Sequence, residues 1–457
     1  MTNIMARPDG NPYFFAQHQH SPGFDPESRQ HQSSPREWYS SNLQTHSPVS
    51  VGARDEICNV YASSSQNPAD STQSWAKALL LDCARAIAEK DTSRVQSIMW
   101  ILNESASPYG DSDQRLMSYF VQALVCKITD TGSRCHRSLT SAAEKTYSFE
   151  SMRNMILNFQ NASPWTTFGH VAANGALLET MEGESKIHII DISSTLCTQW
   201  PTFLEALATR TDITPHLRLT CIVISPEEAA LRVMKQVMNR IDRFARLMGV
   251  PFESTVIHKP HLETLDLDEL NLREGEALAV NCVQTLHHIS ECVAAEEQYS
   301  PRDRILSTFR SAKPKILSIV EDEANMISPD FLGCFREALR FYSLLFESLE
   351  ESFPRASNER LMLERNCARK LVNMLSFDAT ESTERQEKGI HWDYRLRKVG
   401  FEPVSFSHDV VDDVQALLKR YKKGWGLDIT DARLYLTWKE QAVICSTTWK
   451  LITTPSY

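Results

Sequence analysis

The sequence lacks paired cysteines, a signal-like start and any long uncharged apolar run, and each absence excludes a class of protein. No two of its eleven cysteines form a C-x-x-C pair, which argues against a zinc site or a disulfide framework and favours reduced thiols. No uncharged apolar run approaches the roughly 18 residues that a membrane span needs. The N-terminus does not resemble a signal peptide. The sequence therefore predicts an intracellular protein without membrane contact.

The sequence also lacks an excess of positive charge. Acidic residues outnumber basic ones, and the 457-residue chain carries a formal net charge of -10. A chain with this balance repels phosphate backbones, which disfavours DNA binding without a partner. The one basic run lies at the end of a predicted helix. Its cations complement the helix dipole there, which is a purely structural interpretation. The alternative interpretation is a role in nuclear import or phosphate binding. The residues of this candidate basic patch are Lys419, Arg420, Lys422 and Lys423.

Residues 1–72 differ in composition from the remainder, being built from Ser, Gln, His, Asn and Pro without a helical or strand period. Such a segment cannot bury enough apolar surface to offset its chain entropy, so we predict a disordered region. From Trp75 onward apolar residues recur every four positions, as on one face of a helix. Together with the helices that follow, this pattern predicts a helical cap subdomain at residues 73–135.

The predicted cap is a candidate dimerisation surface, because a small helical subdomain beside a complete sheet has more apolar surface than it can bury alone. We expect dimerisation through this cap, and a homo-oligomer is one form that it could take. The candidate interface residues on its first helix are Trp75, Leu79 and Cys83. A polar rim, or alternatively a solvated helix start, is expected at Pro301, Arg302, Asp303 and Arg304.

From residue 186 the pattern changes to strands that alternate with helices. The apolar runs lie at residues 187–190, 217–224, 252–257, 277–283 and 316–320. Strands and helices in this order predict a mostly parallel α/β sheet with right-handed crossovers. Long helices are expected at about 329–350, 357–375 and 384–398, and a closing hairpin at residues 434–447.

Several of these segments match motifs of one known family. Ile187-His188-Ile189-Ile190-Asp191 resembles the VHIID core of the plant GRAS family, with Ile187 in place of the usual valine. The block at 301–304 resembles part of its PFYRE region, and the tryptophans near the C-terminus resemble its SAW region, although Thr447-Thr448-Trp449 replaces the usual Ser-Ala-Trp. The order of all blocks agrees, and segments at 107–111, 191–202 and 353–365 resemble the SHORT-ROOT branch.

The resemblance implies a GRAS domain at residues 73–450 with five regions. These are leucine-rich region I in the cap (73–135), the VHIID region (150–215), leucine-rich region II (216–260), the PFYRE region (265–365) and the SAW region (376–450). The implied fold is a Rossmann-like, methyltransferase-like, mostly parallel sheet core with an N-terminal helical cap.

The resemblance also implies a transcriptional co-regulator of radial patterning and cell division, not an enzyme. Its implied partners are a Scarecrow-type GRAS protein and C2H2 zinc-finger proteins of the BIRD group, which contact DNA in its place. The implied location is the nucleus and also the cytoplasm, with movement between cells. No cofactor is expected.

The alternatives are a methyltransferase that uses S-adenosylmethionine and a small-molecule sensor on the same fold. A cofactor site at the first strand end needs glycines, and none occurs between Asp191 and Gly249. We expect Asp191 to cap a turn by accepting backbone N–H bonds, with ligand binding as the alternative. His188 is interpreted as a satisfied core histidine. His287 and His288 lack a suitably spaced ligand apart from Glu291, so no metal is predicted.

Overall fold

The computed structural model describes residues 74–144, 148–210, 213–290, 300–378 and 381–452. All of them belong to one of two compact units, which spans residues 57–457. The predicted disordered region and Glu291 lie outside the described residues. None of the described helices is long and apolar enough to cross a bilayer.

The helices and strands alternate along most of the chain after an all-helical start. The helices are α3 (Trp75–Ala88), α4 (Thr92–Ser105), α5 (Ser112–Ile128), α6 (Gly132–Glu144), α7 (Phe149–Ala162), α8 (Thr167–Thr180), α9 (Trp200–Ala208), α10 (Glu228–Met248), α11 (Pro301–Ala312), α12 (Phe331–Ser352), α13 (Asn358–Ser376), α14 (Gly389–Lys398) and α15 (His408–Leu418). The strands are β1 (Lys186–Ser193), β2 (His216–Ile224), β3 (Phe252–Lys259), β4 (Ala277–Val283), β5 (Ile316–Asp322), β6 (Phe401–Val404), β7 (Trp425–Thr430), β8 (Arg433–Trp438) and β9 (Gln441–Leu451). Short 3-10 turns are η2 (Leu262–Thr264), η3 (Asp268–Leu270) and η4 (Leu286–His288).

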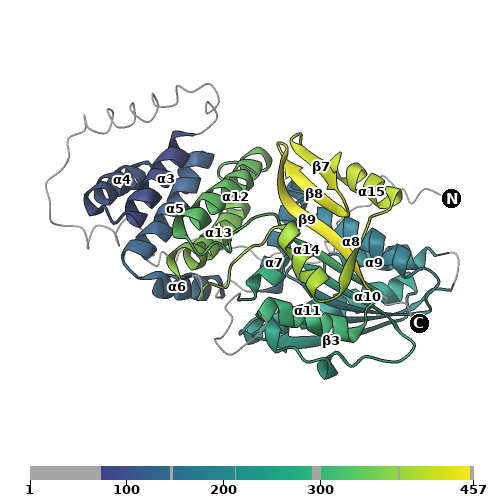
Figure 1. Ribbon diagram of the computed structural model, residues 1–457. Helices are drawn as coiled ribbons and strands as arrows, with labels where there is room; N and C mark the ends of the chain where they lie inside the picture. The colour runs from purple at the N-terminus through teal and green to yellow at the C-terminus, as the bar shows by residue number, and fades with distance from the viewer. Residues whose placement is uncertain (1–73, 145–147, 211–212, 291–299, 379–380, 453–457) are drawn as a thin grey trace. The chain divides into compact units, whose positions relative to one another are not determined.

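The cap is a bundle built from two distant parts of the sequence (Figure 1). Helices α3 to α6 supply one part, and α12 and α13 pack against them, with α13 lying along α5. The start of α5 has the expected capping box, in which Asp111 and Gln114 satisfy each other's backbone N–H groups. Sequence periodicity located α12 and α13 but did not place them in the cap, because an apolar stripe does not identify its partner.

The sheet confirms the predicted α/β core. Its strand order is β3-β2-β1-β4-β5-β9-β8-β7, with β6 beside β9. Strands β1 to β5 are parallel, and β9 runs antiparallel to β5. The predicted closing hairpin is present as β8 and β9, joined at Lys439 and Glu440 in left-handed backbone conformations. Strands β6 and β7 were not predicted, since they are short or only partly buried.

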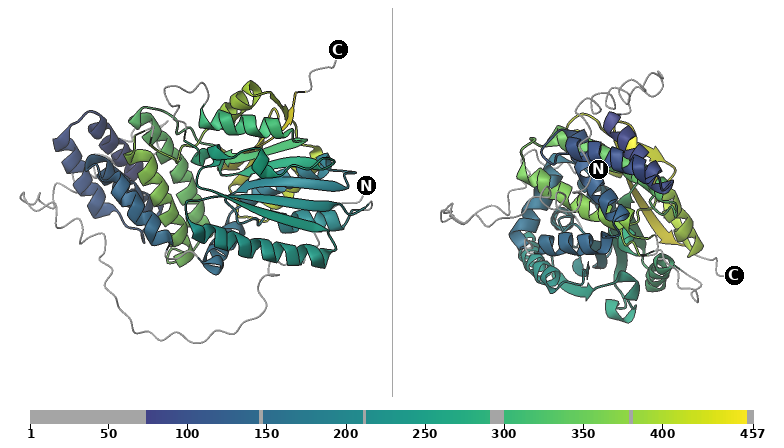
Figure 2. Two further views of the ribbon diagram at one scale, coloured as in Figure 1. Left: turned by 90° about the horizontal axis from the view of Figure 1, so that it is seen from below. Right: turned by 90° about the vertical axis from the view of Figure 1, so that its left-hand side faces the viewer.

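Both faces of the central sheet are covered by helices (Figure 2). Ile187 and Ile189 of β1 face the cluster that contains α9 and α10 residues, whereas Ile190 and Ile192 face the cluster that contains α11 and α14 residues. Apolar side chains on successive positions are therefore buried on opposite faces, which explains the uninterrupted apolar run of a central parallel strand.

The helix expected at 384–398 begins only at Gly389. The preceding segment is extended because its backbone bonds to other elements: the Gln386 carbonyl accepts from Met326 N, and the Arg385 carbonyl accepts from the Arg302 side chain. Glu384, Arg385, Gln386 and Glu387 are all buried, so tertiary contacts override their helix propensity.

Candidate functional site at the carboxyl edge of the sheet

Asp191 is buried near the C-terminal end of β1, at the sheet edge where α/β folds bind ligands. Its carboxylate accepts hydrogen bonds from Asn281 Nδ2 at 2.9 Å, Trp200 Nε1 at 2.8 Å and the Ser193 hydroxyl at 3.1 Å. Burial raises the pKa of Asp191, and these hydrogen bonds act in the opposite direction. The predicted backbone cap is wrong, because all these donors are side chains: Trp200 and Asn281 lie on neighbouring elements, and Ser193 lies on β1 itself.

The loop after β1 fills the space beside Asp191. Leu196 and Cys197 adopt left-handed φ values of 50° and 56°, a conformation that glycine adopts without strain. Neither residue is glycine, so both side chains take up space beside Asp191. The buried Cys197 thiol lies 3.4 Å from Cys221 Sγ. The fully buried Trp200 closes the same space from α9. A nucleotide cofactor at this edge would have to displace these packed groups.

The polar groups around this loop pair with one another. Gln199 Nε2 donates to Asn174 Oδ1 at 3.0 Å, and Asn281 Nδ2 donates to Gln199 Oε1 at 3.0 Å. The pKa of the Cys197 thiol is raised well above its usual value by its hydrogen bond to Cys221 and by burial. A thiol held protonated is a poor nucleophile. The arrangement orders the loop and offers no activated nucleophile or base.

His188, on the opposite face of β1, is buried and hydrogen-bonded as predicted. Its Nε2 lies 2.9 Å from Thr220 Oγ1, and its Nδ1 lies 2.9 Å from Arg218 Nη2. Burial, followed by the Arg218 charge, lowers its pKa to about 4, so the ring is neutral at neutral pH. A neutral histidine with both nitrogens occupied is a component of the core.

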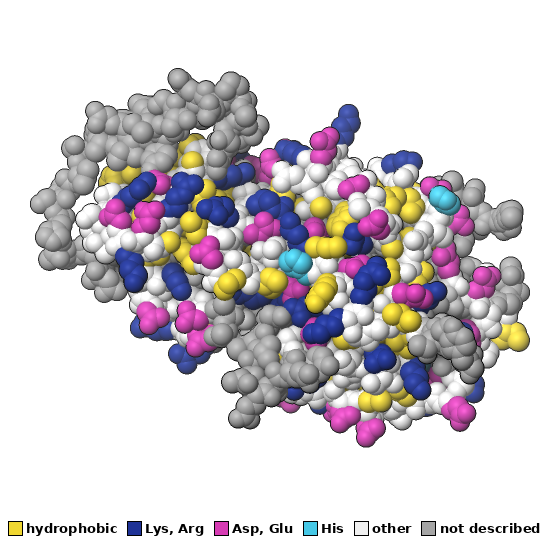
Figure 3. Space-filling view, viewed as in Figure 1, with side chains coloured by type: hydrophobic (Ala, Val, Ile, Leu, Met, Phe, Trp, Pro, Cys, Tyr) yellow, Lys and Arg dark blue, Asp and Glu magenta, His cyan; other side chains and the backbone are white. Residues whose placement is uncertain are grey.

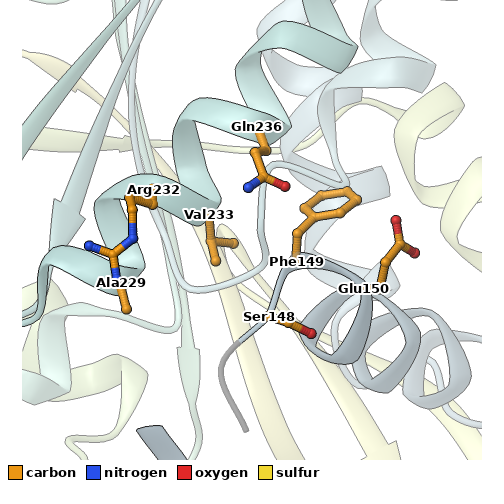
Figure 4. A pocket seen from close by; sticks show the side chains of 7 residues that line it. All are labelled: Ser148, Phe149, Glu150, Ala229, Arg232, Val233 and Gln236. Carbon is orange, nitrogen blue, oxygen red and sulfur yellow. The ribbon is translucent and has the colours of Figure 1, made fainter. Parts of the chain in front are cut away.

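A shallow hollow of about 380 Å³ lies where the N-terminal turns of α7 and α10 meet (Figure 4). Phe149 and Val233 give it an apolar wall, and Gln236 points toward the Phe149 ring. The Arg240 guanidinium lies 4.2 Å from the centre of that ring and 3.0 Å from Glu150 Oε1. These side chains supply contact surface but no group poised for catalysis.

Two of the three predicted cap interface residues are buried. Leu79 and Cys83 are 1% and 0% exposed within the bundle core, so neither side chain reaches the surface. Both lie on the inner face of α3. Apolar residues recur every four positions both on a helix face that packs in a core and on one that binds a partner, so the spacing does not distinguish the two. Trp75 is 36% exposed, and the structure adds Trp100 at 42% and Tyr109 at 65%. Neither Trp100 nor Tyr109 was predicted as an interface residue, because neither continues an apolar stripe.

The predicted polar rim at 301–304 is also mostly internal. Arg302 is fully buried, and it forms an ion pair with Glu387 and donates to the Ile289 carbonyl at 3.0 Å. Asp303 accepts from Arg395 Nη1 and Lys398 Nζ, both at 2.7 Å. Pro301 is buried too, and Arg304 alone of the four is exposed. The block therefore joins α11 to α14 and is not a surface.

The predicted basic patch is exposed. Lys419, Arg420, Lys422 and Lys423 follow α15, and Tyr421 between them anchors the segment by donating to the Gln160 carbonyl at 2.7 Å. On the face shown in Figure 3, Lys and Arg side chains alternate with Asp and Glu side chains rather than forming one basic surface. Its exposure leaves the patch accessible to a receptor or a phosphate group.

The comparisons with known proteins agree with this fold. The GRAS domain family model matches residues 76–450. SHORT-ROOT of Arabidopsis thaliana is 50% identical over 394 residues, which cover 82% of this chain and 73% of that protein. SHORT-ROOT 1 of Oryza sativa subsp. japonica is 45% identical over 416 residues, covering 82% and 68%. The crystal structure of SCL7 from Oryza sativa superposes with a TM-score of 0.69 at 26% identity, covering 83% of this chain and 100% of that one. The chain therefore belongs to the GRAS family, within its SHORT-ROOT branch.

Proposed function

We propose that this protein is a plant transcriptional regulator of development that acts through protein partners. It forms a heterodimer with a Scarecrow-type GRAS protein, and it controls radial patterning and cell division. Membership of the SHORT-ROOT branch supports this proposal, as do the names of more distant relatives. One of these, at 32% identity, is named Scarecrow-like transcription factor PAT1 of Arabidopsis thaliana. In this proposal the protein works in the nucleus, is also present in the cytoplasm, and moves between cells.

Exposed aromatic side chains on the cap carry the proposal. Trp75 belongs to α3 and Trp100 to α4, and Tyr109 lies in the loop before α5. Figure 1 shows α3 and α4 on the side of the bundle away from the sheet. Solvated tryptophans have a large apolar area that a partner can bury, and tryptophan and tyrosine are the residues that dominate binding energy at interfaces. The cap is thus the surface that we assign to the Scarecrow-type partner.

DNA recognition in this proposal is supplied by C2H2 zinc-finger partners of the BIRD group. The chain's net charge of -10 and the mixture of both signs on the face in Figure 3 support this division of labour, because DNA-binding surfaces gather positive charge. An electrophoretic mobility assay tests it: a labelled promoter fragment is expected to shift with this chain only when the zinc-finger protein is present.

The methyltransferase alternative is disfavoured by the contents of the cleft. Asp191 is occupied by side-chain donors, and Trp200 and the loop after β1 fill the space beside it. If the protein were a small-molecule sensor, the hollow between α7 and α10 would be its candidate binding site. That hollow is shallow and partly lined by charged side chains. Neither alternative explains the exposed aromatic side chains of the cap.

Calorimetric titration of the full chain with a Scarecrow-type GRAS protein tests the proposed interface. Trp100→Arg and Trp75→Arg place a charge at the proposed contact, so each should weaken binding at least tenfold. Leu247→Arg is the matched control, since Leu247 is 68% exposed on α10, outside the cap. Circular dichroism establishes that each variant is folded. Wild-type affinity in both tryptophan variants would show that the cap does not form the interface.

A further inference from the structure

A second group of chemically active side chains lies where β4, β5, α13 and the extended segment before α14 meet. His287 and His288 form η4 directly after β4, and Glu384 comes from the segment between α13 and α14. One ligand atom from each lies within 4.8 Å of the others. The sequence predicts no metal here, because no suitable carboxylate is near in sequence. Folding brings Glu384 to the histidine pair.

The first imidazole is held in an orientation that suits a metal ligand. His287 Nδ1 donates to Glu321 Oε2 at 2.7 Å, and the other Glu321 oxygen accepts from the backbone N–H groups of Thr285 and Leu286 at 2.9 and 2.7 Å. This leaves His287 Nε2 directed at the cluster. Metal-binding histidines usually donate their second N–H to a carboxylate in this way, which fixes the tautomer and the ring orientation.

The other two groups complete a set of donors. His288 Nδ1 lies 3.1 Å from Glu384 Oε2, and the His288 ring centre lies 4.1 Å from that of His287. Glu384 is buried, and its two oxygens lie 3.5 Å from Arg369 Nη2 and 3.7 Å from Lys370 Nζ, so cationic groups already face this carboxylate.

The position between these donors already attracts a cation. Lys370 Nζ lies 3.4 Å from His287 Nε2 and 3.7 Å from Glu384 Oε2. Glu384 Oε2 is a buried oxygen, and its contacts with His288 Nδ1 at 3.1 Å and Lys370 Nζ at 3.7 Å lack good hydrogen-bond geometry. The Lys370 side chain is 26% exposed, and that of His288 is 28% exposed, so the ammonium group has a route to solvent and an ion has a route in.

We propose that His287, His288 and Glu384 form a binding site for a divalent transition metal ion, zinc by ligand preference, which displaces the Lys370 ammonium group. Two imidazole nitrogens and one carboxylate oxygen form a known zinc ligand set, with a fourth position for water. The ion joins the end of β4 to the segment before α14. It therefore links two parts of the chain that are distant in sequence, and it should stabilise the fold by an amount that rises with the logarithm of the free zinc concentration above Kd.

Titration of the full, metal-free chain with zinc chloride tests the proposal, with cobalt(II) as a spectroscopic probe of tetrahedral coordination. His288→Ala and Glu384→Gln should each weaken zinc binding at least tenfold. Lys370→Met keeps all three ligands but removes the competing charge, so it should tighten binding about tenfold. His261→Ala is the matched control, because His261 forms an exposed pair with Glu263 at 3.8 Å on another part of the surface.

The variant Lys370→Met keeps the test decisive even if a ligand variant fails to fold. Tighter binding in Lys370→Met, lost again when His288→Ala is added, is the expected result. Two outcomes would overturn the proposal. One is wild-type zinc affinity in folded His288→Ala, and the other is no zinc binding by either the wild-type chain or Lys370→Met.

Discussion

Replacing Glu364 by glutamine should destabilise the helical bundle, because Glu364 is the shared partner of two buried arginines. Its carboxylate lies 2.8 Å from Arg115 Nη1 on α5 and 2.6 Å from Arg360 Nε one turn earlier on α13. All three side chains are 0% exposed. The substitution removes the negative charge, while its amide group places a donor next to a guanidinium group.

The expected cost follows from the partners that remain. Removing one member of a buried ion pair costs about 3–5 kcal/mol. Arg360 keeps Glu350 at 2.6 Å, and Arg115 keeps the Gly110 carbonyl at 2.9 Å. These contacts limit the loss, so we expect the lower end, about 3 kcal/mol in the free energy of unfolding.

Urea unfolding followed by circular dichroism measures this difference. Glu347→Gln on α12 is the control, because the exposed Lys439–Glu347 pair at 2.9 Å should contribute less than about 1 kcal/mol. Replacing all three buried residues by apolar ones, as Arg115→Met, Arg360→Leu and Glu364→Leu, should recover most of the loss. The reasoning is refuted if Glu364→Gln costs no more than Glu347→Gln.

Three further predictions concern the core. Asp191→Asn should cost about 1–3 kcal/mol in urea unfolding, since an amide donor would face Trp200 Nε1 or Asn281 Nδ2; an unchanged midpoint would contradict the network. Lowering the pH from 6.5 to 5 should reduce the free energy of unfolding by up to about 2 kcal/mol through His188. The folded-state pKa of His188 is about 4, so the unfolded chain binds the proton first as the pH falls. The free energy of unfolding of His188→Gln should fall correspondingly less over the same pH range. Gly169→Ala should cost about 1–3 kcal/mol, because its Cβ would lie 2.5 Å from Val320 Cγ1; a thermal melt at the wild-type temperature would exclude this clash.

The predictable part of the fold is the part that local pattern determines. The apolar run at Ile187 predicts a central strand because burial on both faces leaves no alternation, and the Asp111 capping box predicts the start of α5. The parallel pairing of β1 to β5 follows from the alternation with helices, whereas the strand order was not predicted. The bundle was predicted only in part, because α12 and α13 join it from elsewhere in the sequence.

The candidate site was less predictable, since burial of a polar residue depends on distant partners. Arg302 looked like surface until Glu387 was placed beside it, and Leu79 has the same spacing whether its helix face meets a partner or the core. Asp191 was correctly located at the strand end, but its donors come from α9 and β4. Glu384 could not be linked to His288 from spacing alone.

We propose above all that the protein functions through its surface and not through the filled cleft at Asp191. Calorimetry of the full chain, titrated in one buffer with a Scarecrow-type GRAS protein and separately with S-adenosylmethionine, tests it most directly. We predict binding heat with the protein partner and none with the cofactor. Saturable cofactor binding without partner binding would contradict the claim and would make Asp191 a ligand-contacting residue.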